Sequence, residues 1–409
     1  MSPNRLDRRP KIRTAGGTTA ALALAAMLLA GCGSSGSEAN TGGASGGASS
    51  KAAGTPIKVG NIGTYSGPSG SSYSPNRDAV VAWSKAVNAA GGINGHPIEL
   101  YAEDDAGDPA KSAQILRDLV ENKKVVALVG VAAGNTDASW ASYLATKGVP
   151  VVGGVASSTI WNTNPLYFPA SAGSQIKAAV SSLVAKQQGK NNVYSMYCAE
   201  LAVCAGILTP IKSSAEKLGT KFVGSAAVSA SAADYASTCL QAKQTGAEVV
   251  ADNLTLAASA RMIPACDKQG FRPIWLLSQV GVDPSLLAQP ALEGSFVYSD
   301  AFYYTSTVGA EFRTAMGKYS PQTPLTQGTA SWTGAKLFQE ALRNVPADGT
   351  VTAAQVLDGL NSIKNNDLGG ITPQPLSFTQ GQPHEPMTCI FVLQIQNREE
   401  TNQKTTCSN

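Results

Sequence analysis

The chain has 409 residues, of which 43% are apolar and 14% charged, and its formal net charge is +3. This apolar content is enough for well-packed cores, and the length leaves room for two domains of ordinary size. The chain has no basic patch interleaved with aromatic residues and no second long apolar run, which argues against a nucleic-acid-binding protein and against several membrane spans.

The start of the chain has the pattern of a bacterial lipoprotein signal. Basic residues precede the apolar stretch Ala20–Ala30, and small residues then lead into Cys32. The pattern predicts that residues 1–31 are a signal peptide and that Cys32 becomes a lipid-bearing N-terminus on the outer face of the bacterial cell membrane. The alternative is a transmembrane anchor, but about eleven apolar residues are too few where a span needs roughly twenty. Arg8-Arg9 leaves the choice between general and twin-arginine export open.

The predicted leader and the segment behind it change the picture of the mature chain. The leader holds five basic residues and one acidic residue, so without it the formal charge of +3 becomes −1. Residues 33–54 are nearly all Gly, Ser, Ala, Asn and Thr, a composition that cannot bury enough apolar surface to fold. We therefore expect residues 32–55 to be the lipidated cysteine and a flexible tether.

Six further cysteines indicate disulfides. An even number of cysteines in an oxidising compartment is typical of disulfide bonding, and pairing neighbours in sequence closes short loops. A metal site is the competing explanation, but the chain has only two histidines and no CxxC spacing, so we assign no metal. The favoured pairs are Cys198–Cys204, Cys239–Cys266 and Cys389–Cys407.

From Pro56 on, short apolar runs alternate with helical patterns. In chain order the predicted elements are strand Ile57–Ile62, a helix through Ala79–Ala90, strand Ile98–Ala102, a helix capped by Asp108-Pro109, strands Val125–Val129 and Val149–Val152, helix Gln175–Lys186, strand Asn192–Met196, helix Ile207–Leu218, strand Lys221–Val228, helix Ala232–Gln244, strand Glu248–Ala251, helix Ala257–Lys268 and strand Pro273–Leu277. This alternation predicts an α/β protein with parallel sheets covered by helices on both faces. Ligands of such folds bind beyond the carboxyl ends of the strands.

Three segments, in this order, carry a resemblance to a known family: Gly60–Gly67, Val87–Gly95 and Glu103–Pro109. They closely resemble the leucine/isoleucine/valine-binding proteins of ABC importers, and the likeness extends from Pro56 to about Leu393. The resemblance implies a two-lobed type I periplasmic-binding fold, with a mainly parallel sheet flanked by helices in each lobe and a three-strand hinge. It places the first lobe at residues 56–170 plus 298–373 and the second at residues 171–297 plus 374–409.

The resemblance also implies ligand-binding positions in the loops after the strands. Asn135 and Thr136 match the loop that holds the ligand carboxylate, and Ala156, Ser157 and Ser158 match a loop that meets both ends of an amino-acid ligand. Tyr73, Tyr197, Asn253 and Trp161 are candidate walls of the cleft, although Tyr197 and Trp161 have an equally good explanation as packing residues and Asn253 as the end of a strand. The acidic loop 103–108 is better explained as a solvated loop and helix cap than as a metal site.

The chain departs from this family where the ligand ammonium is expected. The family's acidic residue after the strand Pro273–Leu277 is replaced here by Gln279, and an amide cannot neutralise a buried cation. Glu200 could substitute only if the Cys198–Cys204 loop turns it inward. The ligand is therefore expected to be a branched-chain amino acid-like solute, or a carboxylate, an amide or an aromatic acid.

The predicted function is the solute receptor of an ABC importer, which delivers its ligand to a membrane permease with a separate ATPase. A sensory binding protein of the same fold, signalling to a membrane receptor, is the alternative. A third hypothesis, a hydrolase using Ser174, rests only on the S-x-x-K pattern Ser174–Lys177, and no S-D-N or K-T-G follows. Phosphate-binding glycine motifs are absent from the sequence, so we expect no enzyme, no cofactor and no nucleic-acid partner.

Overall fold

A computed structural model describes residues 54–408, except 68–69, 135 and 200–201. The predicted signal peptide, Cys32, all but the last residues of the tether, Asn135 and Glu200 lie outside the described residues. The signal peptide, the lipid on Cys32, the flexible tether and the roles of Asn135 and Glu200 therefore stay predictions.

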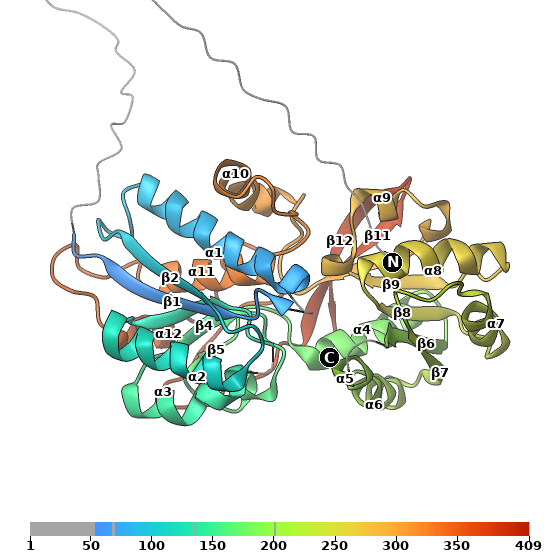
Figure 1. The fold of residues 1–409 in the computed structure, drawn as a ribbon, viewed down its shortest axis with the longest axis horizontal. Coiled ribbons are helices and arrows are strands. Elements are labelled where there is room, and N and C mark those ends of the chain that lie inside the picture. Colours follow the sequence, from blue (N-terminus) through green and yellow to red (C-terminus); the bar gives the residue numbers. More distant parts are fainter. Residues whose placement is uncertain (1–53, 68–69, 135, 200–201, 409) are drawn as a thin grey trace, which may run out of the picture. The chain divides into compact units, whose positions relative to one another are not determined.

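The first sheet is parallel throughout, with the strand order β2-β1-β3-β4-β5 (Figure 1). Its strands are largely buried because helices cover both faces, which is why they read as continuous apolar runs in the sequence. They are β1 (Ile57–Gly63), β2 (Ile98–Asp104), β3 (Ala127–Val131), β4 (Val151–Gly154) and β5 (Tyr167–Phe168).

Two groups of helices cover this sheet. On one face, an extensive apolar core contains buried residues of α1 (Gly70–Ala89), α10 (Ala310–Tyr319), α11 (Thr329–Ala341) and α12 (Ala353–Ser362). On the other face, a second core contains residues of α2 (Pro109–Arg117), η2 (Asp118–Lys123), η3 (Asp137–Trp140), α3 (Ala141–Lys147) and η4 (Thr159–Asn162), where η marks short helices that are not α-helical. Helices from residues 310–362 thus complete a sheet whose strands all come from residues 57–168.

The second sheet has the strand order β12-β11-β10-β9-β8-β6-β7. Neighbouring strands from β10 to β7 are parallel, whereas β11 is antiparallel to both β10 and β12. The strands are β6 (Asn192–Cys198), β7 (Lys221–Val228), β8 (Val249–Asn253), β9 (Ile274–Ser278), β10 (Phe296–Ser299), β11 (Cys389–Gln396) and β12 (Glu399–Cys407).

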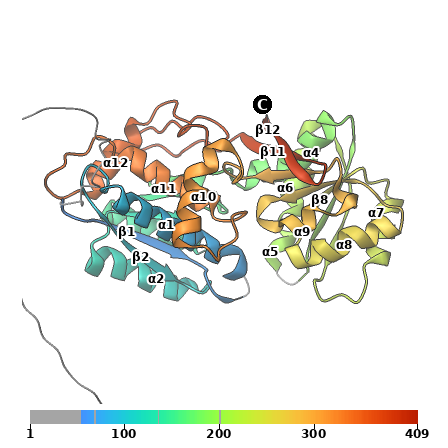
Figure 2. The same cartoon turned by 90° about the horizontal axis from the view of Figure 1, so that it is seen from above.

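Helices also cover both faces of the second sheet (Figure 2). One face packs against α7 (Ala236–Gln244), α8 (Leu256–Lys268) and α9 (Pro284–Leu287), and the other against α4 (Ser174–Gln187) and α6 (Leu208–Leu218). The remaining short elements are α5 (Ala202–Ala205), η5 (Gln279–Gly281), η6 (Pro290–Leu292) and η7 (Thr307–Gly309). The predicted two-lobed α/β architecture, with parallel sheets flanked by helices, is confirmed.

Strands β3 and β4 each end two residues later than the sequence predicts. The prediction ended β4 at Val152, ahead of two glycines, but Gly153 and Gly154 continue the strand, and Gly154 lies opposite Val131 in the ladder. Gly153 lies against Gly334 of α11, so a side chain would not fit at this contact: a Cβ built on Gly153 would be 2.1 Å from the Gly334 Cα. The glycines therefore mark a close helix–strand approach rather than the end of a strand.

The bounds of the two lobes stay a prediction, but the cores show where the crossing segments pack. Ala170 is buried in the core of the first sheet and Ala172 in a core of the second. Leu376 and Phe378, placed by the sequence in the second lobe, are buried in the core of the first sheet. The segment before β11 thus belongs with the first sheet beyond residue 373.

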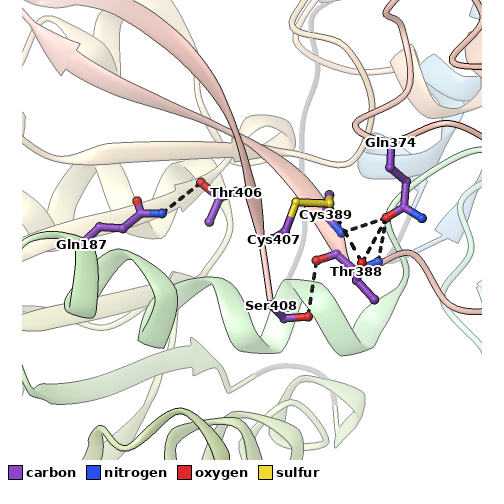
Figure 3. The surroundings of a disulfide bond; sticks show 7 residues. All are labelled: Gln187, Gln374, Thr388, Cys389, Thr406, Cys407 and Ser408. Atoms are coloured by element: carbon purple, nitrogen blue, oxygen red, sulfur yellow. Dashed lines mark hydrogen bonds between the residues drawn. A yellow bond between two sulfur atoms is a disulfide. The ribbon is translucent and has the colours of Figure 1, made fainter.

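Three disulfides are present, and they join the pairs that the sequence favours: Cys198–Cys204, Cys239–Cys266 and Cys389–Cys407. The last pair links opposite residues of β11 and β12, as Figure 3 shows. Beside it, the Gln374 side-chain oxygen accepts hydrogen bonds from the backbone N–H groups of Thr388 and Cys389 at 2.8 and 3.0 Å. The start of β11 is thereby tied both to the C-terminal strand and to the segment that leads into it.

Within the described part of the chain, no helix has both the length and the apolar character that crossing a bilayer requires.

Candidate ligand-binding site

The loops that follow the parallel strands are the first place to look for a site. In the first sheet these loops follow β1, β3 and β4, and in the second they follow β6, β8 and β9. The predicted ligand-binding residues that the structure describes, apart from Tyr73 in α1 and Tyr197 within β6, lie in these loops or at the last residue of a strand.

Thr136, after β3, is held by an internal hydrogen-bond network. Its hydroxyl donates to the Asp105 carboxylate at 2.6 Å, and the same carboxylate accepts from Thr64 at 2.9 Å and from the Gly107 N–H at 2.8 Å. Both Thr136 and Asp105 are buried. The Asp105 carboxylate therefore ties the loops after β1, β2 and β3 to one another. The predicted role of Thr136 in holding a ligand stays a prediction.

Asp137 organises the neighbouring loop and was not found by sequence reasoning. Its carboxylate accepts hydrogen bonds from the Ser158 hydroxyl at 2.9 Å and from the Trp161 indole N–H at 2.8 Å. Burial raises the pKa of Asp137, while these two donors act in the opposite direction. Trp161, a candidate wall, is 1% exposed and packs in the core beneath the loop, donating inward to Asp137.

The loop after β4 offers backbone donors rather than hydroxyls. The Ser157 hydroxyl donates to the Gly134 carbonyl oxygen at 2.8 Å, and the Ser158 hydroxyl is taken by Asp137. In the described chain, neither the Ala156 nor the Ser158 backbone N–H has a hydrogen-bond partner. Unpaired N–H groups in a loop are suited to a carboxylate or another anion.

Tyr73 of α1 lies close to acidic groups from two different segments. Burial raises the pKa of its phenol, and the nearby carboxylates of Asp137 and Asp300 raise it further. Asp300 follows β10 and forms an ion pair with Lys177 in the first turn of α4. Tyr73 is thus a predicted wall residue influenced by carboxylates that follow strands of both sheets, and neither Asp300 nor Lys177 was predicted to take part in the site.

Tyr197 and Asn253 are side by side near the carboxyl ends of β6 and β8, two interior strands of the second sheet. They are paired residues in the β6–β8 ladder, and both are half-buried. The Asn253 amide nitrogen donates to the Ser195 hydroxyl at 3.2 Å, which holds the side chain along the sheet. Their predicted role as walls of the ligand cleft stays a prediction.

Gln279, directly after β9, is buried and contacts the segment before α11. Its amide nitrogen donates to the Thr326 carbonyl oxygen at 2.9 Å and lies 3.3 Å from the Thr329 hydroxyl oxygen. Thr326 and Thr329 precede and begin a helix that packs on the first sheet. Gln279 is therefore a point at which groups belonging to the two sheets meet.

A sequence model of the periplasmic binding protein family matches residues 56–402 of the chain. The chain belongs to this family. This match confirms the predicted family, and the two lobes are those of its type I fold. Proteins of this family bind substrates outside the cytoplasm. No curated protein sequence matches the chain at a significant level.

Solved structures of other binding proteins share this fold. A branched-chain amino acid ABC transporter protein from Thermus thermophilus, solved with bound valine, has a TM-score of 0.72 and 15% identity over 87% of this chain and 97% of that one. A solute-binding protein from Rhodopseudomonas palustris BisB5, in complex with 3,4-dihydroxybenzoic acid, has a TM-score of 0.67 and 17% identity over 86% and 98%. A fatty acid ABC transporter substrate-binding protein from Thermomonospora curvata has a TM-score of 0.66 and 17% identity over 86% and 92%. Identity this low shows the fold alone.

In this periplasmic binding protein, three surface cavities lie away from the predicted ligand residues. They have volumes of about 420, 770 and 300 Å³ and lie beside α7 and α8, between α4, α6 and residues 385–388, and around residues 92–94 and 336–343. No predicted ligand-binding residue lines any of the three. In the described residues, no group of three His, Cys, Asp or Glu side chains is placed to hold a metal ion.

Sequence reasoning missed Asp137, Lys177, Asp300 and Thr326 for a common reason. Each acts through a partner distant in sequence, such as Asp300 with Lys177 across 123 residues. A signal existed for Asp137, because it is the first acidic residue after β3 at the edge where ligands bind. The S-x-x-K pattern marked Lys177 only as part of a hydrolase motif, and no local pattern distinguishes Asp300 or Thr326.

Proposed function

We propose that this protein is the extracytoplasmic solute-binding lipoprotein of an ABC importer. It captures a small polar solute between two lobes, proposed at residues 56–170 plus 298–373 and 171–297 plus 374–409, although Leu376 and Phe378 pack in the core of the first sheet. The solute favours the closed state through its higher affinity for that state, and the closed protein delivers it to a membrane permease driven by separate ATPase subunits. Lipid on Cys32 attaches the protein to the outer face of the cell membrane.

The observation that carries this proposal is the convergence of polar groups from both sheets. The Gln279 amide reaches Thr326, and the Tyr73 phenol is close to both Asp137 and Asp300. On the first sheet, the free Ala156 and Ser158 N–H groups are suited to a ligand carboxylate. A branched-chain amino acid-like solute, a carboxylate, an amide or an aromatic acid fits such a set of groups.

The similar solved structures support a small-molecule ligand of this kind. One of them is described with bound valine, another with 3,4-dihydroxybenzoic acid, and a third as a fatty acid transporter protein. The chemistry of these ligands differs widely, so the fold supports solute binding while the side chains of this chain must select the solute.

Catalysis by Ser174 has little support from its surroundings. Ser174 begins α4, and Lys177, the base that the S-x-x-K pattern would need, forms an ion pair with Asp300. The amino group of Lys177 is thus engaged by a carboxylate from another segment of the chain. The proposal accordingly includes no catalytic residue, no cofactor and no metal.

A thermal-shift screen followed by an uptake assay tests the proposal. The full chain, purified in detergent, is screened against amino acids, carboxylates, amides and aromatic acids, because a ligand that binds only the native state raises the melting temperature. We expect stabilisation by one chemical class, and we expect cells lacking the protein to lose uptake of that radiolabelled solute.

Two outcomes would contradict the proposal. Absence of stabilisation by every class would argue against solute binding itself. Stabilisation by a solute whose uptake does not change when the gene is deleted would instead favour the sensory alternative.

A further inference from the structure

Gln279 keeps a buried hydrogen-bond acceptor without a partner. The residue is 2% exposed, and its amide nitrogen is committed to Thr326 and Thr329. Its side-chain oxygen is buried and accepts no hydrogen bond in the described chain. Buried polar atoms are nearly always paired in native proteins. An unpaired acceptor at the carboxyl end of a strand, where ligands of this fold class bind, is therefore suited to a hydrogen-bond donor on a ligand.

The orientation of this amide is set by its neighbour. If the amide were turned over, the Gln279 oxygen would face the Thr326 carbonyl oxygen, which accepts but cannot donate. The nitrogen must therefore face Thr326, and the oxygen is the group left for a ligand. Gln279 thus offers an acceptor and no free donor.

Gln327 repeats this arrangement from the other side of the same contact. Its amide nitrogen donates to the Val280 carbonyl oxygen at 3.0 Å, and its side-chain oxygen is also buried without a partner in the described residues. Each glutamine therefore donates to the backbone of the other's segment and retains an empty acceptor. Sequence reasoning did not identify Gln327.

Two carboxylates of the candidate site, those of Asp137 and Asp300, already have partners. Asp300 forms an ion pair with Lys177, and the Asp137 carboxylate accepts from Ser158 and Trp161. A ligand ammonium at Gln279 would be buried against neutral amide oxygens, which do not offset its loss of hydration. A neutral donor, such as a hydroxyl or an amide N–H, loses much less on burial.

We infer that Gln279, together with Gln327, selects a carboxylate solute that carries a neutral hydrogen-bond donor, above all a hydroxycarboxylate, and discriminates against the corresponding amino acid. The inference rests on the proposed function, since it assumes that solute binds at these strand ends. It assigns the solute carboxylate to the N–H groups of Ala156 and Ser158 and the solute hydroxyl to the Gln279 oxygen.

The first test compares isosteric solutes on the wild-type protein. The full chain in detergent is titrated calorimetrically with 2-hydroxy-4-methylpentanoate, leucine and 4-methylpentanoate, and with 3-phenyllactate, phenylalanine and 3-phenylpropanoate. In at least one series we expect the hydroxy acid to bind about tenfold or more tightly than both analogues, because a site built for a hydroxyl rejects solutes that lack one.

Variants then connect the preference to Gln279. Gln279→Met keeps the length of the side chain but removes the acceptor, so the ratio of hydroxy acid to plain acid affinity should fall toward one. Gln279→Glu supplies a carboxylate and should shift preference toward the amino acid. Gln289→Met is the matched control, because Gln289 also has a buried, unpaired side-chain oxygen but donates to Ala260, away from this contact.

Each outcome decides the inference. Tighter binding of leucine or phenylalanine than of the hydroxy acids, equal binding within each series, or no binding of any of the six probes would overturn it. An unchanged preference in a folded Gln279→Met protein would do so too. If the uptake assay still identifies a transported solute in these cases, the proposed function stands although the selectivity inference fails.

Discussion

His384 is a buried histidine that its surroundings keep neutral. Its ring packs against Phe168 and Phe378, with ring centroids 4.6 and 4.9 Å away, and the residue is 5% exposed. Burial lowers the pKa of His384 to about 4, although the Pro165 carbonyl oxygen favours the protonated ring. The nitrogen Nε2 is buried and has no partner in the described chain, so a proton added there would be buried without an acceptor.

This environment predicts a loss of stability in mild acid. The unfolded chain takes up a proton on this imidazole below about pH 6.5, and the folded chain only below about pH 4. Between these values the unfolded state binds more protons, so the free energy of unfolding is undiminished near pH 7 and falls as the pH drops toward 4. A shift of this size corresponds to about 3 kcal/mol at most.

Urea unfolding at pH 7 and pH 4.5 measures the effect. His384→Phe retains aromatic packing but cannot take up a proton, so its loss of stability between these pH values should be smaller by about 1–3 kcal/mol. Subtracting one protein from the other cancels the titration of the remaining acids. The same pH dependence in both proteins would show that His384 is not the responsible group.

For single residues of the candidate site, the sequence predicted their place after a strand but not their hydrogen-bond partners. The ends of the strands located Ser157, Ser158 and Gln279, because polar residues that follow apolar runs can be read from the sequence. What each side chain contacts could not be read. Ser158 donates to Asp137, and Gln279 to Thr326, 47 residues away, because tertiary packing decides these pairs.

At the scale of elements, the approach of α11 to β4 depends on two glycines. Gly153 has a left-handed backbone conformation, with φ of 57°, and faces Gly334 directly. A side chain at either position would push the helix away from the sheet. This contact holds a helix from the second half of the sequence against strands from the first.

Gly153→Ala should therefore destabilise the protein more than its conformation alone explains. The left-handed backbone costs an alanine about 1–2 kcal/mol, and the clash with Gly334 should add about 1–3 kcal/mol. Gly148→Ala is the control, since Gly148 has φ of 63° but nothing within 4 Å of its Cβ position. Denaturant unfolding of both variants gives the comparison, and equal losses would mean that the helix shifts freely.

The β11–β12 hairpin is one of the elements that the sequence analysis did not predict. The run Ile390–Ile395 is apolar enough for a buried strand, but the two-residue turn at Asn397 and Arg398 lacks the usual glycine. Both turn residues have positive φ, at 55° and 66°, which arginine adopts only rarely. A residue outside the hairpin stabilises the turn, because the Glu293 carboxylate accepts a hydrogen bond from the Asn397 N–H at 3.1 Å.

At the scale of the whole molecule, the alternation of strands and helices predicted parallel sheets covered by helices, but not the strands β5, β10, β11 and β12. It could not predict where the chain passes between the two sheets, because that depends on contacts such as the hydrogen bond from the Ala172 N–H to the Asp300 carbonyl oxygen at 2.8 Å. These residues are 128 positions apart, and nothing local marks either as a crossing. The resemblance to a family supplied what periodicity lacked, by ordering the lobes along the chain.

The predicted signal peptide and tether concern the whole chain rather than the fold. Basic residues, a short apolar stretch and Cys32 precede about twenty mostly small residues, and a tether of this length would span on the order of 25 Å if it is flexible as predicted. Lipid attached to Cys32 would hold the body near the membrane and so near a permease. A span built from the same apolar stretch would be roughly half the required length.

Cys32→Ser separates these explanations. The wild-type chain should fractionate with membranes and partition into the detergent phase, and mass spectrometry should find residues 1–31 absent and lipid on the N-terminal cysteine. The variant should lose the lipid while keeping its disulfides, because Cys32 is not one of the paired cysteines. If the variant stays membrane-bound after a high-salt wash, the apolar stretch itself is the anchor. A lipid-free variant that binds solute but no longer supports uptake would tie transport to attachment at the membrane.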